Sequence, residues 1–143
     1  MKSENQVVLE FPSRSSNESF ARVAAAGFAM QLDPTLEELG DIKTAVSEAV
    51  TNAIIHGYPD CIGRIVMKLR IREGNVMEII VKDWGVGIAD VEQARKPMFT
   101  TGNDERSGMG FTIMESFMTN LEIISKPGKG TTVHMRRKLQ RRQ

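Results

Sequence analysis

Two strand-like segments separated by a Gly-Asn pair constrain the fold of this chain more than any other feature of its sequence. The segments, residues 64–73 and 76–85, are rich in β-branched and aliphatic side chains. Gly74 and Asn75 lie between them and suit a tight turn, because both residue types tolerate positive φ angles. The pattern predicts an antiparallel hairpin, and therefore a sheet that is not built from parallel βαβ units.

A short strand and a helix are expected ahead of the hairpin. The strand covers residues 7–11, and the helix covers residues 13–30, where Ser15 and Glu18 have the spacing of a capping box. The apolar stripe expected along this helix consists of Phe20, Val23, Gly27 and Met30.

A second helix is expected from Thr35 to about His56. Thr35 and Glu38 again have capping-box spacing, and Gly57 is suited to end the helix. Its apolar stripe consists of Leu39, Ile42, Val46, Val50 and Ala53.

Three polar residues of this second helix are each separated by four positions. Glu48, Asn52 and His56 should therefore stand one above the other on one face, away from the apolar stripe. Such a ladder is either a solvated surface or the wall of a site.

The remainder of the chain predicts a helical turn, a loop, a helix and two strands. The turn covers residues 90–95, the loop residues 97–108, and the helix begins near Gly110. Residues 121–126 and 131–137 are the closing strands. A hairpin-rich sheet with three main helices indicates an α+β two-layer sandwich.

The composition indicates a single soluble globular domain spanning residues 1–143, with a short basic tail at 138–143. Apolar residues make up 41% and charged residues 26% of the chain, and the net charge of +1 offers no general attraction to nucleic acid. The single cysteine excludes an internal disulfide. No signal peptide or membrane-spanning stretch is apparent, so we expect a cytoplasmic protein with no membrane partner.

Three turns each carry two glycines separated by one residue, at residues 83–87, 107–111 and 128–132. Glycines there let a ligand approach the backbone N–H groups, and the second turn also opens a helix, where a phosphate is favoured. The chain has no P-loop, because Lys129 is followed by Gly130, and it has no G-x-G-x-x-G after a strand.

Taken in order, E-x-x-x-N on a helix, D-x-G-x-G, G-x-G-F and G-x-G-T resemble the GHKL family of ATP-binding domains. DNA gyrase, Hsp90 chaperones, histidine kinases and MutL share this domain. The resemblance covers residues 48–132 and implies the Bergerat fold, a two-layer α/β sandwich with helices on one face of a mixed, largely antiparallel sheet.

A free-standing domain of this length resembles the serine-kinase anti-sigma factors of endospore-forming bacteria. Residues 17–22, 47–58, 99–101 and 105–115 carry this resemblance. It implies a homodimer that holds a sporulation sigma factor inactive and uses ATP to phosphorylate a serine of an anti-anti-sigma factor. Whether ATP or ADP is bound would decide which partner is held.

The resemblance also implies roles for individual residues. Glu48 would be the catalytic base, and Asn52 the ligand of Mg²⁺. Asp83 would accept a hydrogen bond from the adenine amino group, with Gly85 and Gly87 letting the chain pass close to the nucleotide.

Further nucleotide contacts are implied by the loop at residues 97–107, which stands where the family has its ATP lid. The residues expected to contact nucleotide from this region and beyond are Thr101, Ser107, Gly108, Met109, Gly110 and Thr131. Arg106 would neutralise the γ-phosphate as a second catalytic residue or, on the alternative interpretation, be a solvated loop arginine. Arg22 on the first helix would contact a protein partner.

Three alternatives remain open from the sequence. The chain could be a nucleotide-gated sigma-binding module that transfers no phosphate. It could belong to a related stress-sigma system. It could also be the ATPase part of a larger chaperone or repair machine, although a sequence that opens with Met1 and closes its last strand before a short tail is expected to be a complete domain.

Overall fold

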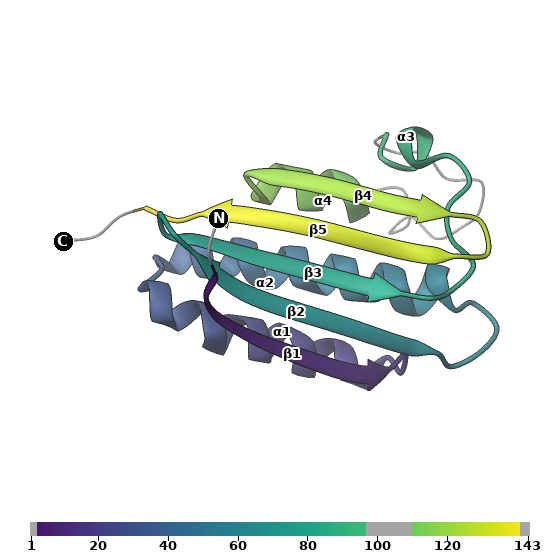
Figure 1. Cartoon of the computed structure of the whole chain (residues 1–143), viewed down its shortest axis with the longest axis horizontal. Coiled ribbons are helices and arrows are strands. Elements are labelled where there is room, and N and C mark those ends of the chain that lie inside the picture. The colour runs from purple at the N-terminus through teal and green to yellow at the C-terminus, as the bar shows by residue number, and fades with distance from the viewer. Residues whose placement is uncertain (1–2, 97–109, 141–143) are drawn as a thin grey trace.

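One five-stranded sheet organises the protein. The structure, a computed structural model, describes residues 3–96 and 110–140. The strands are β1 (Ser3–Pro12), β2 (Arg64–Arg72), β3 (Val76–Asp83), β4 (Asn120–Lys126) and β5 (Gly130–Lys138). Their order across the sheet is β1-β2-β3-β5-β4, and every neighbouring pair is antiparallel (Figure 1).

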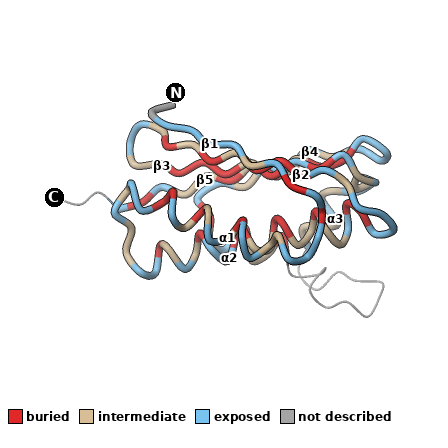
Figure 2. Tube along the Cα trace, turned by 90° about the horizontal axis from the view of Figure 1, so that it is seen from below, coloured by how far each residue is buried: buried red, intermediate tan, exposed pale blue. Residues whose placement is uncertain are grey.

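The helices form a second layer on one face of this sheet, and the opposite face is left open (Figure 2). They are α1 (Ser16–Ala29), α2 (Leu36–Asn52), α3 (Val91–Ala94) and α4 (Gly110–Phe117), with short turns η1 (Met30–Leu32) and η2 (Ala53–Gly57). The α+β two-layer sandwich is confirmed. The resemblance implied a mixed sheet, whereas all the described strand pairings are antiparallel.

The predicted hairpin is present as β2 and β3. Arg72 pairs with Val76, and residues 73–75 connect the strands. Gly74 and Asn75 have φ angles of 83° and 60°, in the left-handed region that these two residue types tolerate best. The turn chemistry in the sequence therefore identified the central strand pair correctly.

The core lies between the helices and the helix-facing side chains of the sheet. Alternation along β2 and β3 sends Met67, Leu69 and Ile79 to this side, where each is fully buried. They face the apolar stripe of α2, whose Ile42 and Val46 are also fully buried. The stripe predicted for this helix is confirmed.

The stripe predicted for α1 faces outward instead. Phe20, Val23 and Met30 are each more than half exposed. The buried residues of this helix are Ala21, Ala25, Phe28 and Ala29. The helix is apolar around most of its circumference, so periodicity alone does not decide which side is buried. Its alanine-rich side packs more closely against α2 and the sheet than the side with Phe20 and Val23 could. The predicted stripe was therefore wrong.

The two predicted capping boxes have different outcomes. Thr35 and Glu38 form both reciprocal hydrogen bonds at the start of α2. Ser15 makes no side-chain cap, because its backbone is already helical and a capping side chain requires an extended conformation. The Glu18 carboxylate instead accepts a hydrogen bond from Ser47, so the prediction of a Ser15–Glu18 capping box was wrong.

A buried carboxylate, Glu78, lies among cationic side chains on the open face of the sheet. Glu78 is fully buried, and the register places Arg70 and Arg136 directly opposite it on the two neighbouring strands. Arg72 and His134 reach it from diagonal positions. Burial would raise the pKa of this carboxyl group, but hydrogen bonds from His134, Arg72 and Arg136 outweigh burial and lower it from 4.5 to about 2.

We expect Glu78→Gln to lower the free energy of unfolding by about 2 kcal/mol at neutral pH, because the pKa shift is large and the arginines are partly solvated. A pKa that is lower in the folded state stabilises the fold above pH 4.5, and this contribution is lost as the pH falls toward 2. Urea unfolding at neutral pH and near pH 3 measures both effects. Glu10→Gln, in an exposed pair with Arg64, is the matched control and should change little; an equal loss in both variants would contradict the role of Glu78.

Candidate functional site

The last turn of α2 lies against the start of α4. Glu48 and Asn52 are half-buried on α2. A Cβ at Gly110 would lie 2.9 Å from the Asn52 Nδ2 atom, so the glycine that opens α4 is in close contact with the Asn52 side chain. Two residues that the sequence assigned to nucleotide, 58 positions apart along the chain, are thus brought together.

The helix continues past Asn52 as the π-helical turn η2. His56 lies in this π turn with its side chain exposed, whereas Glu48 and Asn52 are half-buried. Of the three residues of the predicted ladder, the two on α2 are therefore the ones partly enclosed by the fold. Single π turns occur often at functional sites, and this one places Gly57 beneath the end of β3.

Asp83 ends β3 on the helix-facing side of the sheet and is 4% exposed. A Cβ at Gly57 would lie 2.9 Å from the Asp83 Cγ atom. The carboxylate accepts backbone hydrogen bonds from Gly85, at 2.9 Å, and from Thr131. Burial raises the pKa of this carboxyl group despite both bonds. Within residues 3–96 and 110–140 no lysine or arginine pairs with it, and a buried carboxylate of this kind is typical of a ligand site.

Gly85 and Gly87 are required by close packing of the chain against itself. A Cβ at Gly85 would lie 1.9 Å from the carbonyl oxygen of Gly57, which also accepts the Val86 N–H at 2.9 Å. Gly87 has a φ of 78°, and its Cβ would lie 2.0 Å from the carbonyl oxygen of Lys126. These glycines press the loop after β3 onto η2 and onto the β4–β5 turn.

Thr131 lies beside Asp83 and is held by Ser125, a residue that the sequence analysis missed. The two hydroxyl oxygens are 2.8 Å apart. Ser125 donates to the Gly130 carbonyl and accepts the Ile88 N–H at 2.7 Å, so the Thr131 hydroxyl is the donor between them. Ser125 occupies a helix-facing position of β4, and a polar residue there was the available signal.

Tyr58 is a second residue that the sequence analysis missed. Its side chain is buried, and its hydroxyl donates to the Arg64 carbonyl at 2.6 Å and accepts the Trp84 N–H at 2.7 Å. It therefore connects the end of η2 to the backbone at the start of β2 and to the backbone directly after β3, next to Asp83. Nothing in the sequence beyond its place after Gly57 indicated this role.

Five predicted site residues are not among those that the structure describes. Thr101, Arg106, Ser107, Gly108 and Met109 lie outside the described residues, so their roles stay predictions.

Arg22 does not join the Asn52 and Asp83 group. It lies between α1 and α2, where it donates to Glu18 at 3.0 Å and to Ser47 at 3.3 Å. Ser47 directly precedes Glu48, so Arg22 is close in structure to the helix that carries the predicted base.

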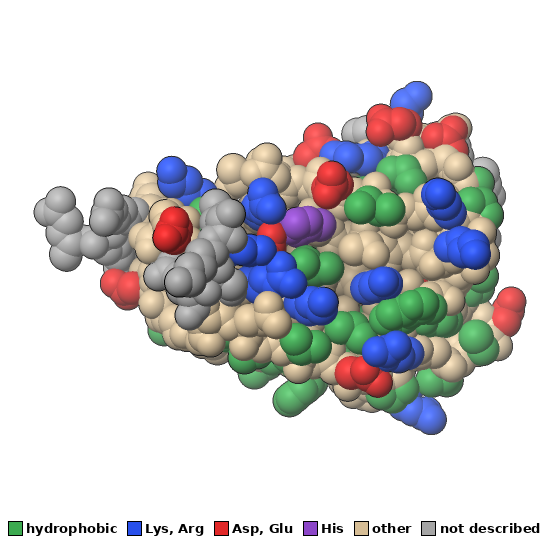
Figure 3. Space-filling model, in the orientation of Figure 1, with side chains coloured by type: hydrophobic (Ala, Val, Ile, Leu, Met, Phe, Trp, Pro, Cys, Tyr) green, Lys and Arg blue, Asp and Glu red, His purple; other side chains and the backbone are tan. Residues whose placement is uncertain are grey.

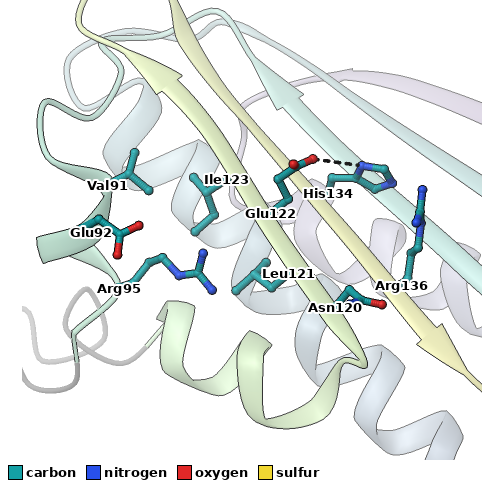
Figure 4. Close-up of a pocket in the computed structure, with 9 residues that line it drawn as sticks. All are labelled: Val91, Glu92, Arg95, Asn120, Leu121, Glu122, Ile123, His134 and Arg136. Carbon is teal, nitrogen blue, oxygen red and sulfur yellow. Dashed lines mark ion pairs between the residues drawn. The ribbon is translucent and has the colours of Figure 1, made fainter.

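A hollow of about 530 Å³ at the outer edge of the sheet is separate from these residues. Figure 4 shows Glu92 of α3 and Arg95, directly after this helix, on one side of it and β4 and β5 residues on the other. The Glu122–His134 contact, at 3.8 Å, lies on its sheet side. None of the predicted site residues that the structure describes lines it.

We expect Tyr58→Phe to weaken ATP binding by about tenfold, because the buried Trp84 N–H loses its acceptor and the loop carrying Asp83 and Gly85 is released. Calorimetric titration with ATP measures the affinity, and thermal unfolding measures stability. Thr35→Ala is the matched control, because it removes a hydroxyl acceptor at the far end of the same helix unit. If both variants lose equal stability and only Tyr58→Phe loses affinity, the positioning role is supported; unchanged affinity would refute it.

Comparison with known proteins agrees with this fold. A family model described as a histidine kinase-like ATPase domain matches residues 11–137. Among solved structures, the RsbU and RsbW domains of a Mycobacterium tuberculosis protein share the fold, with a TM-score of 0.71 and 19% identity over 96% of this chain and 33% of that chain. The Erythrobacter litoralis blue-light activated histidine kinase domain gives a TM-score of 0.52 and 28% identity over 72% of this chain and 45% of that chain.

Curated relatives match over nearly the whole chain. Anti-sigma F factor of Pasteuria penetrans is 55% identical, covering 95% of this chain and 92% of the relative. The proteins of the same name from Thermoanaerobacter sp. strain X514 and Geobacillus kaustophilus are 58% and 56% identical, covering 94% and 93% of this chain and 94% and 92% of the relatives. No described helix is long and apolar enough to cross a membrane. The chain belongs to the anti-sigma F factor family, built on the histidine kinase-like ATPase domain.

Proposed function

We propose that this protein binds ATP with Mg²⁺ and transfers the γ-phosphate to a serine of an anti-anti-sigma factor. In the same proposal it inhibits a sporulation sigma factor and acts as a cytoplasmic homodimer. Two features joined through η2 carry the proposal: the buried carboxylate of Asp83, which has no Lys or Arg partner among the described residues, and the Asn52–Gly110 contact. The 53–58% identity to anti-sigma F factors favours this partner set over a related stress-sigma system.

Asp83 is the proposed adenine contact. A carboxylate held by the backbone N–H groups of Gly85 and Thr131 is fixed in position before the ligand arrives. As an acceptor it selects the adenine amino group over the guanine carbonyl, because guanine would leave the buried carboxylate without a donor.

Asn52 and the start of α4 are the proposed phosphate end of the site. The amide oxygen of Asn52 is a hard, neutral ligand suited to Mg²⁺, which commonly keeps waters and phosphate oxygens as its other ligands. No group of three His, Cys, Asp or Glu suited to a metal occurs in the described part of the chain, which fits an ion held mainly by the nucleotide. The N–H groups at Gly108 and Gly110 would face the phosphates at the N-terminus of α4.

Glu48 is the proposed base. It lies one helical turn before Asn52, so its carboxylate is presented on the same side of α2. The carboxylate accepts the proton of the acceptor serine as the serine oxygen attacks the γ-phosphorus. The bond between the γ-phosphorus and the oxygen that bridges it to the β-phosphate breaks, and this oxygen leaves with ADP. Arg106 would neutralise charge on the transferred group.

The outward stripe of α1 is the proposed dimer contact. Phe20, Val23 and Met30 form one exposed apolar face, and Gly27 between them allows a second helix to approach closely. Arg22 lies beside this face and is held by Glu18 and Ser47, which suits a residue that contacts a protein partner.

We expect Glu48→Gln to bind ATP normally and to lose phosphate transfer by at least about a hundredfold, the usual contribution of a general base. The measurement is transfer of labelled γ-phosphate to the anti-anti-sigma protein. Glu37→Gln, an exposed change on the same helix, should keep activity. Equal transfer by Glu48→Gln would exclude the assigned role. No transfer by the wild type, with ATP still bound, would favour the nucleotide-gated module without kinase activity.

We expect Phe20→Glu to raise the dimer dissociation constant by at least about tenfold, because it places a charge in each half of an apolar contact. Analytical ultracentrifugation across a concentration series measures this constant. Ile62→Glu, at an equally exposed apolar residue before β2, should leave it unchanged. A dimer of unchanged strength in Phe20→Glu would place the interface elsewhere.

A further inference from the structure

The open face of the sheet carries most of its charge as cations (Figure 3). Strand alternation sends these lysines and arginines to the side away from the helices. They include Arg64, Lys68, Arg70, Arg72, Lys82 and Arg136. Lys138 ends β5 on the same side, opposite Val76.

Acidic side chains are few on this face. Of the side chains that the structure describes there, only Glu10, Glu78 and Glu122 are acidic. The whole chain has a net charge of only +1, so the excess of cations here is balanced by acidic groups elsewhere on the molecule. The protein is therefore electrostatically two-sided, and the open face attracts anionic partners.

The Glu78 network holds the central cations in place. Three arginines and His134 share this single buried carboxylate, so positive charge remains in excess at the centre. Arg136 stays 43% exposed and Arg70 23% exposed, and each guanidinium has more N–H donors than its contact with Glu78 uses. Cations that are already ordered lose less conformational entropy when a partner binds.

Apolar residues lie among these cations. Val8 on β1 and Ile124 on β4 are more than half exposed, and Ile80 beside the Glu78 network is half-buried. A protein partner can supply both carboxylates for the cations and aliphatic side chains for these apolar residues. A surface that binds single-stranded nucleic acid would need free aromatic faces.

Trp84 is the one Phe, Tyr or Trp side chain described at this face, and it does not serve that purpose. Arg64 and Lys82 stack over the Trp84 ring, at 4.4 Å and 5.0 Å from its centroid. The ring is therefore occupied by cations of the same surface, and base stacking would have to displace them.

We propose that the open sheet face is a docking surface for a carboxylate-rich protein segment. This surface lies on the opposite side of the sheet from Asp83 and Asn52, so docking does not require the nucleotide site or the α1 stripe. The inference goes beyond the proposed kinase and sigma-binding activity and does not depend on it.

Charge reversal tests the surface. Lys68→Glu combined with Lys138→Glu changes two cations of the open face and leaves the Glu78 network intact. Arg14→Glu combined with Lys43→Glu is the matched control, because it changes the net charge by the same amount at exposed positions away from this face. Fluorescence anisotropy with a labelled oligoglutamate of about 20 residues and an oligo-dT of matched charge measures binding at low and moderate salt.

The expected result is oligoglutamate binding that weakens with salt and falls at least about tenfold in the open-face variant, with a change of less than about twofold in the control. No binding to oligoglutamate at low salt would overturn the proposal, and so would equal losses in both variants. Tighter binding of oligo-dT than of oligoglutamate would also overturn it, in favour of a nucleic-acid surface. Thermal unfolding of both variants verifies that each is folded.

Discussion

The close contact between the end of α2 and the end of β3 is the constraint on which the site depends. Gly57 lies beneath the Asp83 carboxylate, and its carbonyl accepts the Val86 N–H. A side chain at position 57 would meet Asp83, and one at Gly85 would meet the Gly57 backbone. Because Asn52 begins the same π turn, this contact sets the spacing between the adenine end and the phosphate end of the proposed nucleotide site.

The sheet separates two chemically different surfaces. Side chains on the helix-facing side are apolar until the strand ends, where Asp83 and Thr131 introduce polar groups near α2. Many side chains on the other side are charged, and one of them, Glu78, is fully buried beneath the arginines around it. A single strand therefore serves both surfaces, because successive side chains point in opposite directions.

Helix α1 shows how packing chooses between two apolar stripes. Ala21 and Ala25 fit against the neighbouring helix with little side-chain entropy to lose, and they bring the two backbones close together. The larger Phe20 and Val23 are then left on the outside, where they are available to a partner. The same choice places Arg22 between the helices, in contact with Ser47, one residue before the proposed base.

Local signals in the sequence determined the β2–β3 hairpin, the Thr35 cap and the core stripe of α2, because each depends on residues within a few positions of one another. The order of the glycine motifs also predicted the family, which the comparisons confirm, and it selected Asn52 and Gly110, which the structure places in contact. Only the tertiary structure decided which stripe of α1 is buried, that α2 continues into a π turn, and that Tyr58 and Ser125 hold the loops of the site. It also decided the Glu78 network, whose members come from three strands. These features depend on contacts between segments far apart in the chain, and local periodicity carries no information about which distant surface will cover a given face.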